Sequence, residues 1–150
     1  MHKPTLTGSC YCGNLQLAIG LSQSPADYQP RACDCEFCCK HGAAWLSDPD
    51  GVLTITVRDD ARLRRLKQGD ELAEFLLCAD CGVVVAVSYE AAGTRFAAIN
   101  ARAVTLPADR AQAFAEPVPA SPKRLSAAEK TARWQQLWFR GVILQSRPSG

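Results

Sequence analysis

The chain has 150 residues, of which 47% are apolar and 21% charged, as in an ordinary globular domain. Its 17 basic and 15 acidic residues leave a net charge of +2, too small to indicate a nucleic-acid partner. No apolar run approaches the roughly 18 residues that cross a bilayer, and the first residues (MHKPT) lack the apolar core of a signal peptide. We therefore expect a cytoplasmic protein with no membrane partner, whose eight cysteines are reduced and bind metal rather than form disulfides.

The first two thirds of the sequence predict short strands separated by turns. A glycine-flanked turn at residues 8–13 leads into an alternating segment, and two prolines predict a loop at residues 22–30. The letters DPDG at residues 48–51 are a strong turn signal. Strands are expected at residues 14–19, 43–46, 52–57, 63–66, 73–77, 83–88 and 96–100.

The last third changes character. Residues 107–114 predict a short helix, and we expect the tail from residue 147 to be frayed. Three prolines are expected to exclude regular structure between them, namely Pro117, Pro119 and Pro122.

A further helix is predicted to begin at Ser126, because Ser126 and Glu129 have the spacing of a capping box. Trp134, Leu137 and Trp138 would lie on one side of it, and packing against a sheet is the simpler explanation of that face. The sequence thus predicts one mainly β domain over residues 1–150. Its core would span about residues 5–105, with folded antiparallel sheets and a C-terminal helical extension over about residues 106–150.

Two cysteine pairs are each followed directly by glycine, which accepts the backbone angles that point amides at sulfur. They are Cys10 and Cys12 before Gly13, and Cys78 and Cys81 before Gly82. Each pair can supply half of a tetrahedral tetrathiolate site that would join the first turn to the middle of the sheet. Zinc is the preferred ion, although an iron–sulfur cluster or unliganded core thiols are alternatives.

The remaining cysteines crowd into the letters CDCEFCC. One turn can close Cys33, Cys35 and Cys38 around a second metal, and three protein ligands leave a tetrahedral ion with an open position. An open zinc can lower the pKa of an incoming thiol or polarise a carbonyl. Cys39 is expected to be a bystander, since adjacent side chains diverge, although a closed four-cysteine site or a redox role stays open. His41 is expected to be solvated or hydrogen-bonded rather than functional.

Three motifs occur together in order: GSCYCGNL at residues 8–15, CDCEFCCKHGA at residues 33–43 and LCADCG at residues 77–82. With FAAINAR at residues 96–102, they resemble the glutathione-dependent formaldehyde-activating enzyme family, also called the centromere protein V or GFA domain. The resemblance covers roughly Thr7 to Arg102 and implies an Mss4-like fold, in which antiparallel sheets are joined at a zinc site.

The resemblance also implies two zinc ions and an activity. The structural ion would be held by Cys10, Cys12, Cys78 and Cys81, and the catalytic ion by Cys33, Cys35 and Cys38. The family reaction condenses formaldehyde with glutathione to S-hydroxymethylglutathione, so the implied class is a carbon–sulfur lyase and the implied partner a small thiol such as glutathione.

Two residues depart from the family pattern, which often reads Cys-His-Cys-x-x-Cys-Arg across the second cluster. Here Asp34 replaces the histidine and Cys39 the arginine. Both changes make the site less favourable to an anionic thiol, because one adds negative charge and the other removes a two-point carboxylate clamp.

The leading prediction is a zinc-dependent carbon–sulfur lyase acting on a thiol–aldehyde adduct. Lys40 and Arg31 are candidates to orient an acidic substrate, although solvated surface charge is the simpler explanation of each. The alternatives are a non-catalytic, zinc-stabilised binding module and a thiol redox or zinc-buffering protein.

Overall fold

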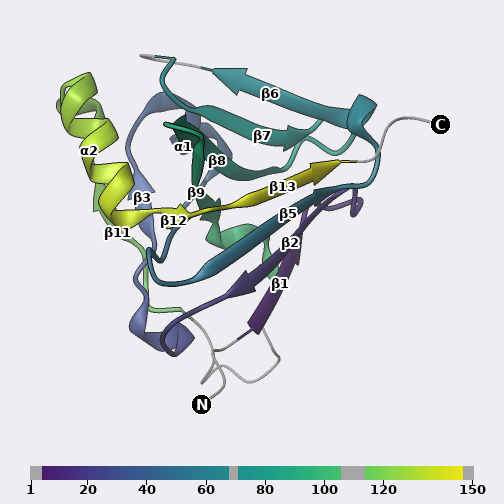
Figure 1. Cartoon of the computed structure of the whole chain (residues 1–150), viewed down its shortest axis with the longest axis horizontal. Coiled ribbons are helices and arrows are strands. Elements are labelled where there is room, and N and C mark those ends of the chain that lie inside the picture. The colour runs from purple at the N-terminus through teal and green to yellow at the C-terminus, as the bar shows by residue number, and fades with distance from the viewer. Residues whose placement is uncertain (1–4, 68–70, 106–113, 147–150) are drawn as a thin grey trace.

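The computed structural model describes residues 5–67, 71–105 and 114–146, which form two β-sheets and a C-terminal helix (Figure 1). The first sheet contains, in spatial order, β10 (Val104–Thr105), β1 (Thr5–Ser9), β2 (Leu15–Gly20), β5 (Val52–Val57) and β13 (Ile143–Ser146). Neither α-helix that the structure describes has the length and apolar character needed to pass through a bilayer.

The second sheet is larger and carries both helices against it. Its order is β11 (Val118–Ala120), β3 (Arg31–Cys33), β4 (Trp45–Leu46), β9 (Thr94–Asn100), β8 (Val84–Ala91), β7 (Glu74–Cys78) and β6 (Leu63–Lys67), with β12 (Phe139–Arg140) also paired to β9. The helices are α1 (Glu36–His41) and α2 (Ala127–Leu137). Short 3₁₀ turns lie at Pro25–Asp27, Asp60–Arg62, Ala101–Ala103 and Pro122–Arg124.

The core lies between the two sheets and is built by alternation. In β2 and β5 every second residue is buried, because successive side chains of a strand point to opposite faces. The inward residues meet across the antiparallel pair: Leu15 opposite Val57, Leu17 opposite Ile55, and Ile19 opposite Leu53.

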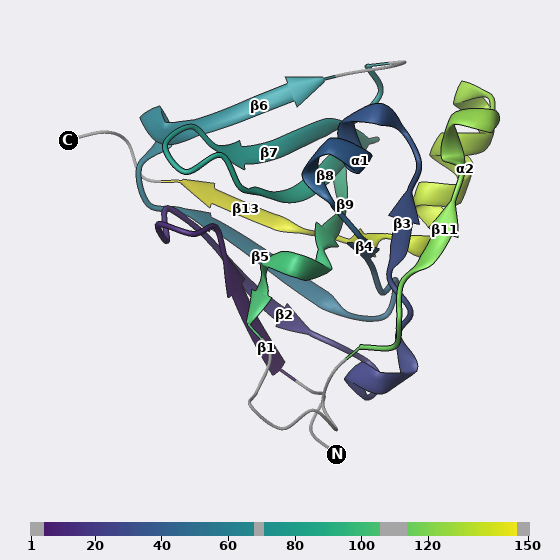
Figure 2. The ribbon, with the colours of Figure 1, turned by 180° about the vertical axis from the view of Figure 1, so that it is seen from behind.

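The second sheet is covered on both faces, which explains why the first four residues of β8, residues 84–87, are all apolar and buried. One face packs into the core with residues such as Val85 and Ile99. The other carries Val87 and Ala98 and packs with residues of α1 and the α2 region. Figure 2 shows β3, α1, β11 and α2 gathered at this side of the molecule.

The chain returns to both sheets after α2. Phe139 of β12 is fully buried, and β13 pairs with β5 in parallel register. The prediction of a mainly β fold with a C-terminal helix is confirmed, whereas an entirely antiparallel arrangement is not found, because β11–β3 and β13–β5 are parallel.

The prediction that prolines exclude regular structure between residues 117 and 122 is wrong. Val118–Ala120 forms β11 and pairs with β3, with Pro119 opposite Ala32. An edge strand tolerates proline because one side of it needs no ladder donor. The capping box of Ser126 and Glu129 is confirmed. The expected helix at residues 107–114 and the tail from residue 147 lie almost wholly outside the described residues.

A buried carboxylate fastens the loop after β2 to the turn before β5. Asp48 is 3% exposed, and its Oδ2 accepts hydrogen bonds from the Ser22 amide (2.8 Å), the Ser22 hydroxyl (2.7 Å) and the Tyr28 hydroxyl (2.5 Å). Its Oδ1 accepts from the Asp50 amide at 2.9 Å. Burial by itself would raise the pKa of Asp48, but these donors favour the charged form and lower the pKa below its usual value.

We expect Asp48→Asn to lower the free energy of unfolding by about 1–3 kcal/mol at pH 7, because an amide cannot accept all of these bonds. Since the folded-state pKa of Asp48 is depressed, its contribution is present above the unfolded pKa of about 3.9 and is lost as the pH falls through the folded value. Urea unfolding of both proteins at neutral and acidic pH measures the difference, which should shrink on acidification.

Asp27→Asn is the matched control, because Asp27 is exposed, and it should change stability little at either pH. A stability difference for Asp48→Asn that does not vary with pH would contradict the assignment.

Candidate functional site

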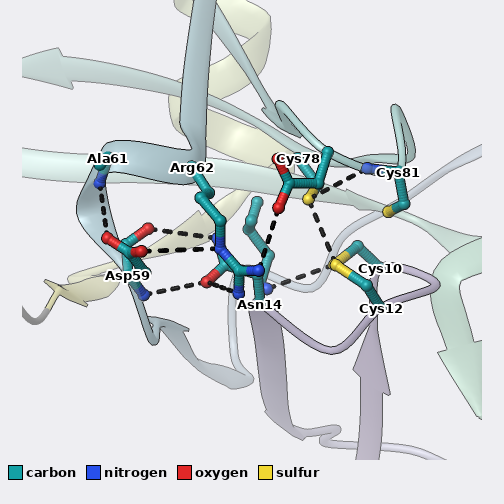
Figure 3. Close-up of polar contacts among 10 residues, drawn as sticks. Cys10, Cys12, Asn14, Asp59, Ala61, Arg62, Cys78 and Cys81 are labelled. Atoms are coloured by element: carbon teal, nitrogen blue, oxygen red, sulfur yellow. Dashed lines mark hydrogen bonds and ion pairs between the residues drawn. The ribbon is translucent and has the colours of Figure 1, made fainter. Parts of the chain in front are cut away.

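The first cysteine cluster joins the two sheets (Figure 3). Cys10 and Cys12 lie in the turn between β1 and β2, whereas Cys78 ends β7 and Cys81 lies in the turn to β8. The four sulfurs lie within 4.8 Å of one another, with 3.8 Å between Cys10 and Cys12 and 3.5 Å between Cys12 and Cys78. A tetrahedral zinc with Zn–S bonds of about 2.3 Å places its sulfurs about 3.8 Å apart, so this arrangement fits the ion.

Backbone amides donate hydrogen bonds to these sulfurs, as expected from the glycine that follows each cysteine pair. The Leu15 amide donates to Cys10 Sγ at 3.3 Å, and the Cys81 amide donates to Cys78 Sγ at 3.5 Å. Gly13 and Gly82 have φ of 85° and 78°, a conformation that favours glycine. The turns therefore hold the sulfurs in place and stabilise thiolates, which are the form that binds metal.

The pKa values of this cluster diverge. Burial raises the pKa of Cys10, and it raises that of Cys78 to about 11. Burial would also raise the pKa of Cys81, but the amides of Val83 and Cys12 and the neighbouring thiols lower it to about 6. Without a cation, the cluster thus disfavours having several of its four thiols ionised at once. A divalent ion would offset the repulsion and the burial cost of these thiolates.

A polar network lies beside this cluster, and sequence reasoning missed it (Figure 3). Asn14 is fully buried, and its Oδ1 accepts from the Asp59 amide (2.9 Å) and from Arg62 Nη2 (3.1 Å). Arg62 Nη1 also bonds Asp80 Oδ2 at 3.0 Å, inside the Cys78–Cys81 turn. A single asparagine after a glycine gives no sequence signal for this role, because the partner is 45 residues away.

The second cluster is local. Cys33 ends β3, Cys35 is the N-cap of α1, and Cys38 lies one turn further on, so that the three sulfurs fall within 4.8 Å of one another. The Cys38 amide donates to Cys35 Sγ at 3.4 Å. The indole Nε1 of Trp45 donates to Cys38 Sγ at 3.3 Å, a bond that neither motif nor spacing predicts.

Within the described ranges, no fourth cysteine, histidine or carboxylate joins this trio. Cys39 is exposed, with its sulfur 3.8 Å from the Cys33 carbonyl oxygen, and His41 is exposed with its ring 4.5 Å from that of Phe37. Lys40 pairs with Glu36 at 3.0 Å. The trio can therefore supply three thiolates to a metal and leave one position to another molecule.

The trio shares its protons unevenly. Contact with the Cys38 thiol lowers the pKa of Cys33 to about 6, while contact with Cys33 and burial raise that of Cys38. Burial raises the pKa of Cys35. One thiolate is thus favoured near neutral pH, and a divalent cation would favour the other two.

A pocket of about 430 Å³ adjoins the trio and not the first cluster. Cys33, Cys35 and Cys38 all line it, whereas no cysteine of the first cluster does. Its apolar wall includes side chains from β4, β7, β8, β11 and α2, among them Trp45, Phe75, Trp134, Leu137 and Trp138. The volume is in the range of small-molecule sites.

The aromatic face of α2 both packs on the sheet and lines this pocket. The ring of Trp134 meets Tyr89 of β8 edge-on at 5.4 Å and stacks on Trp138 at 4.8 Å. The packing interpretation is therefore correct for Trp134, but the same side chains also form a wall of the pocket.

No family model and no curated protein matches the chain. Among solved structures, it is similar to the crystal structure of a structural genomics target from Rhodobacter sphaeroides, with 22% sequence identity and a TM-score of 0.52. The match covers 75% of this chain and 99% of that one. At this identity the similarity shows a shared fold alone.

We expect Cys78→Ser to lower the melting temperature by about 5 °C or more beyond the loss caused by Cys38→Ser, in metal-loaded protein. Both side chains are at most 2% exposed, so the cost of burying the new hydroxyl is matched. Cys78, however, connects segments 66 residues apart, whereas Cys38 closes a loop with Cys33 and Cys35.

Thermal unfolding followed by circular dichroism makes the comparison, with metal content measured on each variant. Equal losses would indicate that both clusters support the fold to the same extent.

Proposed function

We propose that the protein is a zinc-dependent enzyme of the carbon–sulfur lyase type, which makes or breaks an adduct between a thiol and an aldehyde. The observation that carries the proposal is the trio of Cys33, Cys35 and Cys38 lining a pocket of about 430 Å³ with no fourth protein donor among the described residues. The motifs that resemble the formaldehyde-activating family agree with this reaction class.

The proposal includes the fold family and both ions. An Mss4-like fold is supported by two sheets that meet at the first cysteine cluster, where Cys12 and Cys78 lie 3.5 Å apart. We assign the structural zinc to Cys10, Cys12, Cys78 and Cys81, because their turns come from both sheets and none of the four lines the pocket. The second zinc belongs to the trio.

A zinc ion bound at the trio would supply a Lewis acid that favours the thiolate form of a thiol or polarises a carbonyl. In the addition, the thiol sulfur attacks the carbonyl carbon, an S–C bond forms, and the carbonyl oxygen takes the proton that the thiol loses. In the reverse direction the same S–C bond breaks and the aldehyde is released.

The chain's own residues position these reactants. The Trp45 indole fixes the orientation of Cys38 through its hydrogen bond to Sγ, and the Cys38 amide does the same for Cys35. Trp134 and Trp138 form an apolar wall that excludes water and holds the adduct beside the sulfurs. Holding two reactants together is the main rate effect available in such a site.

Cobalt-substituted protein tests the open position directly. A neutral thiol, 2-mercaptoethanol, should change the visible absorption of the cobalt protein, and Cys38→Ser should abolish that change because the trio is broken. Cys39→Ser is the matched control, since Cys39 is exposed and outside the trio, and it should respond like the wild type.

The reaction itself is followed by the rate at which formaldehyde and 2-mercaptoethanol form their adduct, with and without wild-type protein and each variant. If the cobalt spectrum does not change when thiol is added, the proposal is contradicted. That result would favour a binding module with closed metal sites. Loss of metal from the trio alone under mild oxidation, with no effect on adduct formation, would favour a redox or zinc-buffering role.

A further inference from the structure

The charged side chains that line the pocket beside the trio are all basic. Four basic residues line it, and no aspartate or glutamate of the described ranges does: the four are Arg31, Lys123, Lys130 and Arg133. Lys123 lies 3.9 Å from Asp34, and Lys130 also has an interaction within the protein. The two arginines are therefore the better candidates to contact a ligand.

Arg31 projects from β3, two residues before Cys33, and is only partly exposed. Its Nη2 donates to the Ser47 hydroxyl at 2.7 Å, a neutral partner that satisfies one of the five N–H donors of the guanidinium. Burial lowers the pKa of Arg31, and the positive charge of Arg133 lowers it further. Both arginines line the pocket, so two positive charges face it with no carboxylate among its described lining residues.

Arg133 comes from α2 and precedes Trp134, whose ring is fixed between Tyr89 and Trp138. The helix therefore presents a cation and an aromatic surface to the pocket together. An arginine pair recognises a planar anion such as a carboxylate by two-point hydrogen bonds, and an apolar wall recognises the rest of such a molecule.

We propose that Arg31 and Arg133 bind the carboxylate of a small organic acid whose apolar body lies against Trp134 and Trp138. The assignment of this acid as the thiol or aldehyde that reacts at the trio rests on the proposed function, whereas the binding itself does not. The two arginines supply the clamp that Cys39, in the place of the family's arginine, does not.

The same charges disfavour the ammonium group of a peptide such as glutathione, whereas its two carboxylates suit them. Its ammonium group would enter a pocket lined by four basic residues and by no described carboxylate, and like charges repel strongly in a partly desolvated site. An acid with a single negative charge meets complementary charge at one wall and apolar surface at the others.

Binding is measured with two probes that carry no thiol and no aldehyde: 3-phenylpropanoate and its neutral amide. Intrinsic fluorescence is a suitable signal, because all three tryptophans of the chain line the pocket. The acid should bind about tenfold more tightly than the amide, and added salt should reduce that preference.

Arg133→Gln should weaken binding of the acid about tenfold and leave binding of the amide unchanged. Arg133 is exposed on α2, so the substitution leaves the core intact. Arg124→Gln is the matched control: it removes the same charge from an exposed residue nearby that does not line the pocket, and it should preserve the preference for the acid.

Equal affinity for the two probes, no saturable binding of either in the millimolar range, or equal effects of the two arginine variants would each overturn the inference. The cobalt experiment with the neutral thiol is independent of these outcomes. If the cobalt spectrum responds to the thiol but the acid binds no more tightly than the amide, the acid site is excluded and the proposed reaction stands. If the acid binds more tightly but the spectrum does not respond, the proposed reaction is excluded and the acid site stands.

Discussion

The meeting of four sulfurs between the two sheets is the constraint on which the rest of the structure depends. Cys10 and Cys12 belong to a turn of the first sheet, and Cys78 and Cys81 to a turn of the second. Four thiolates this close would repel one another, whereas a bound cation would hold them together and fix the angle between the sheets. The network of Asn14, Arg62 and Asp80 secures this junction from outside the sulfurs.

The second cluster is built differently from the first. Its three cysteines come from one short segment, which is backed by β4 and β9 of the second sheet. Asn100 at the end of β9 connects this region to β8, because it accepts from the Ala44 amide and donates to the Val84 carbonyl. A site of this kind contributes little to joining distant parts of the chain. Its structure instead suits the reception of a ligand in the adjoining pocket.

The strands of the sheets and the composition of both clusters could be predicted from the sequence, because alternation in β2 and β5 and the short cysteine spacings are local signals. Most of the features that the sequence did not predict depend on contacts between residues far apart in the chain. The strand β11 carries a proline and exists because β3 pairs with it, and the parallel return of β13 to β5 depends on a partner almost ninety residues earlier. Likewise, the placement of Arg31 and Arg133 at one pocket arises from strand order and helix placement, and no short window of sequence contains both residues. The bond from Trp45 to Cys38 spans only seven residues, but neither the motif nor the spacing specifies it.

The wall formed by β11 and α2 belongs to an excursion of the chain between β10 and β12, two strands anchored in the sheets. All seven cysteines of the two clusters lie outside that excursion, whereas Arg133 and Trp134 lie within it. Part of the pocket wall is therefore encoded in a stretch of the gene separate from both cysteine clusters, whereas Arg31 lies beside Cys33. Exchanging the excursion between its two fixed ends would therefore reshape the wall of the pocket while leaving the cysteines of both clusters in place.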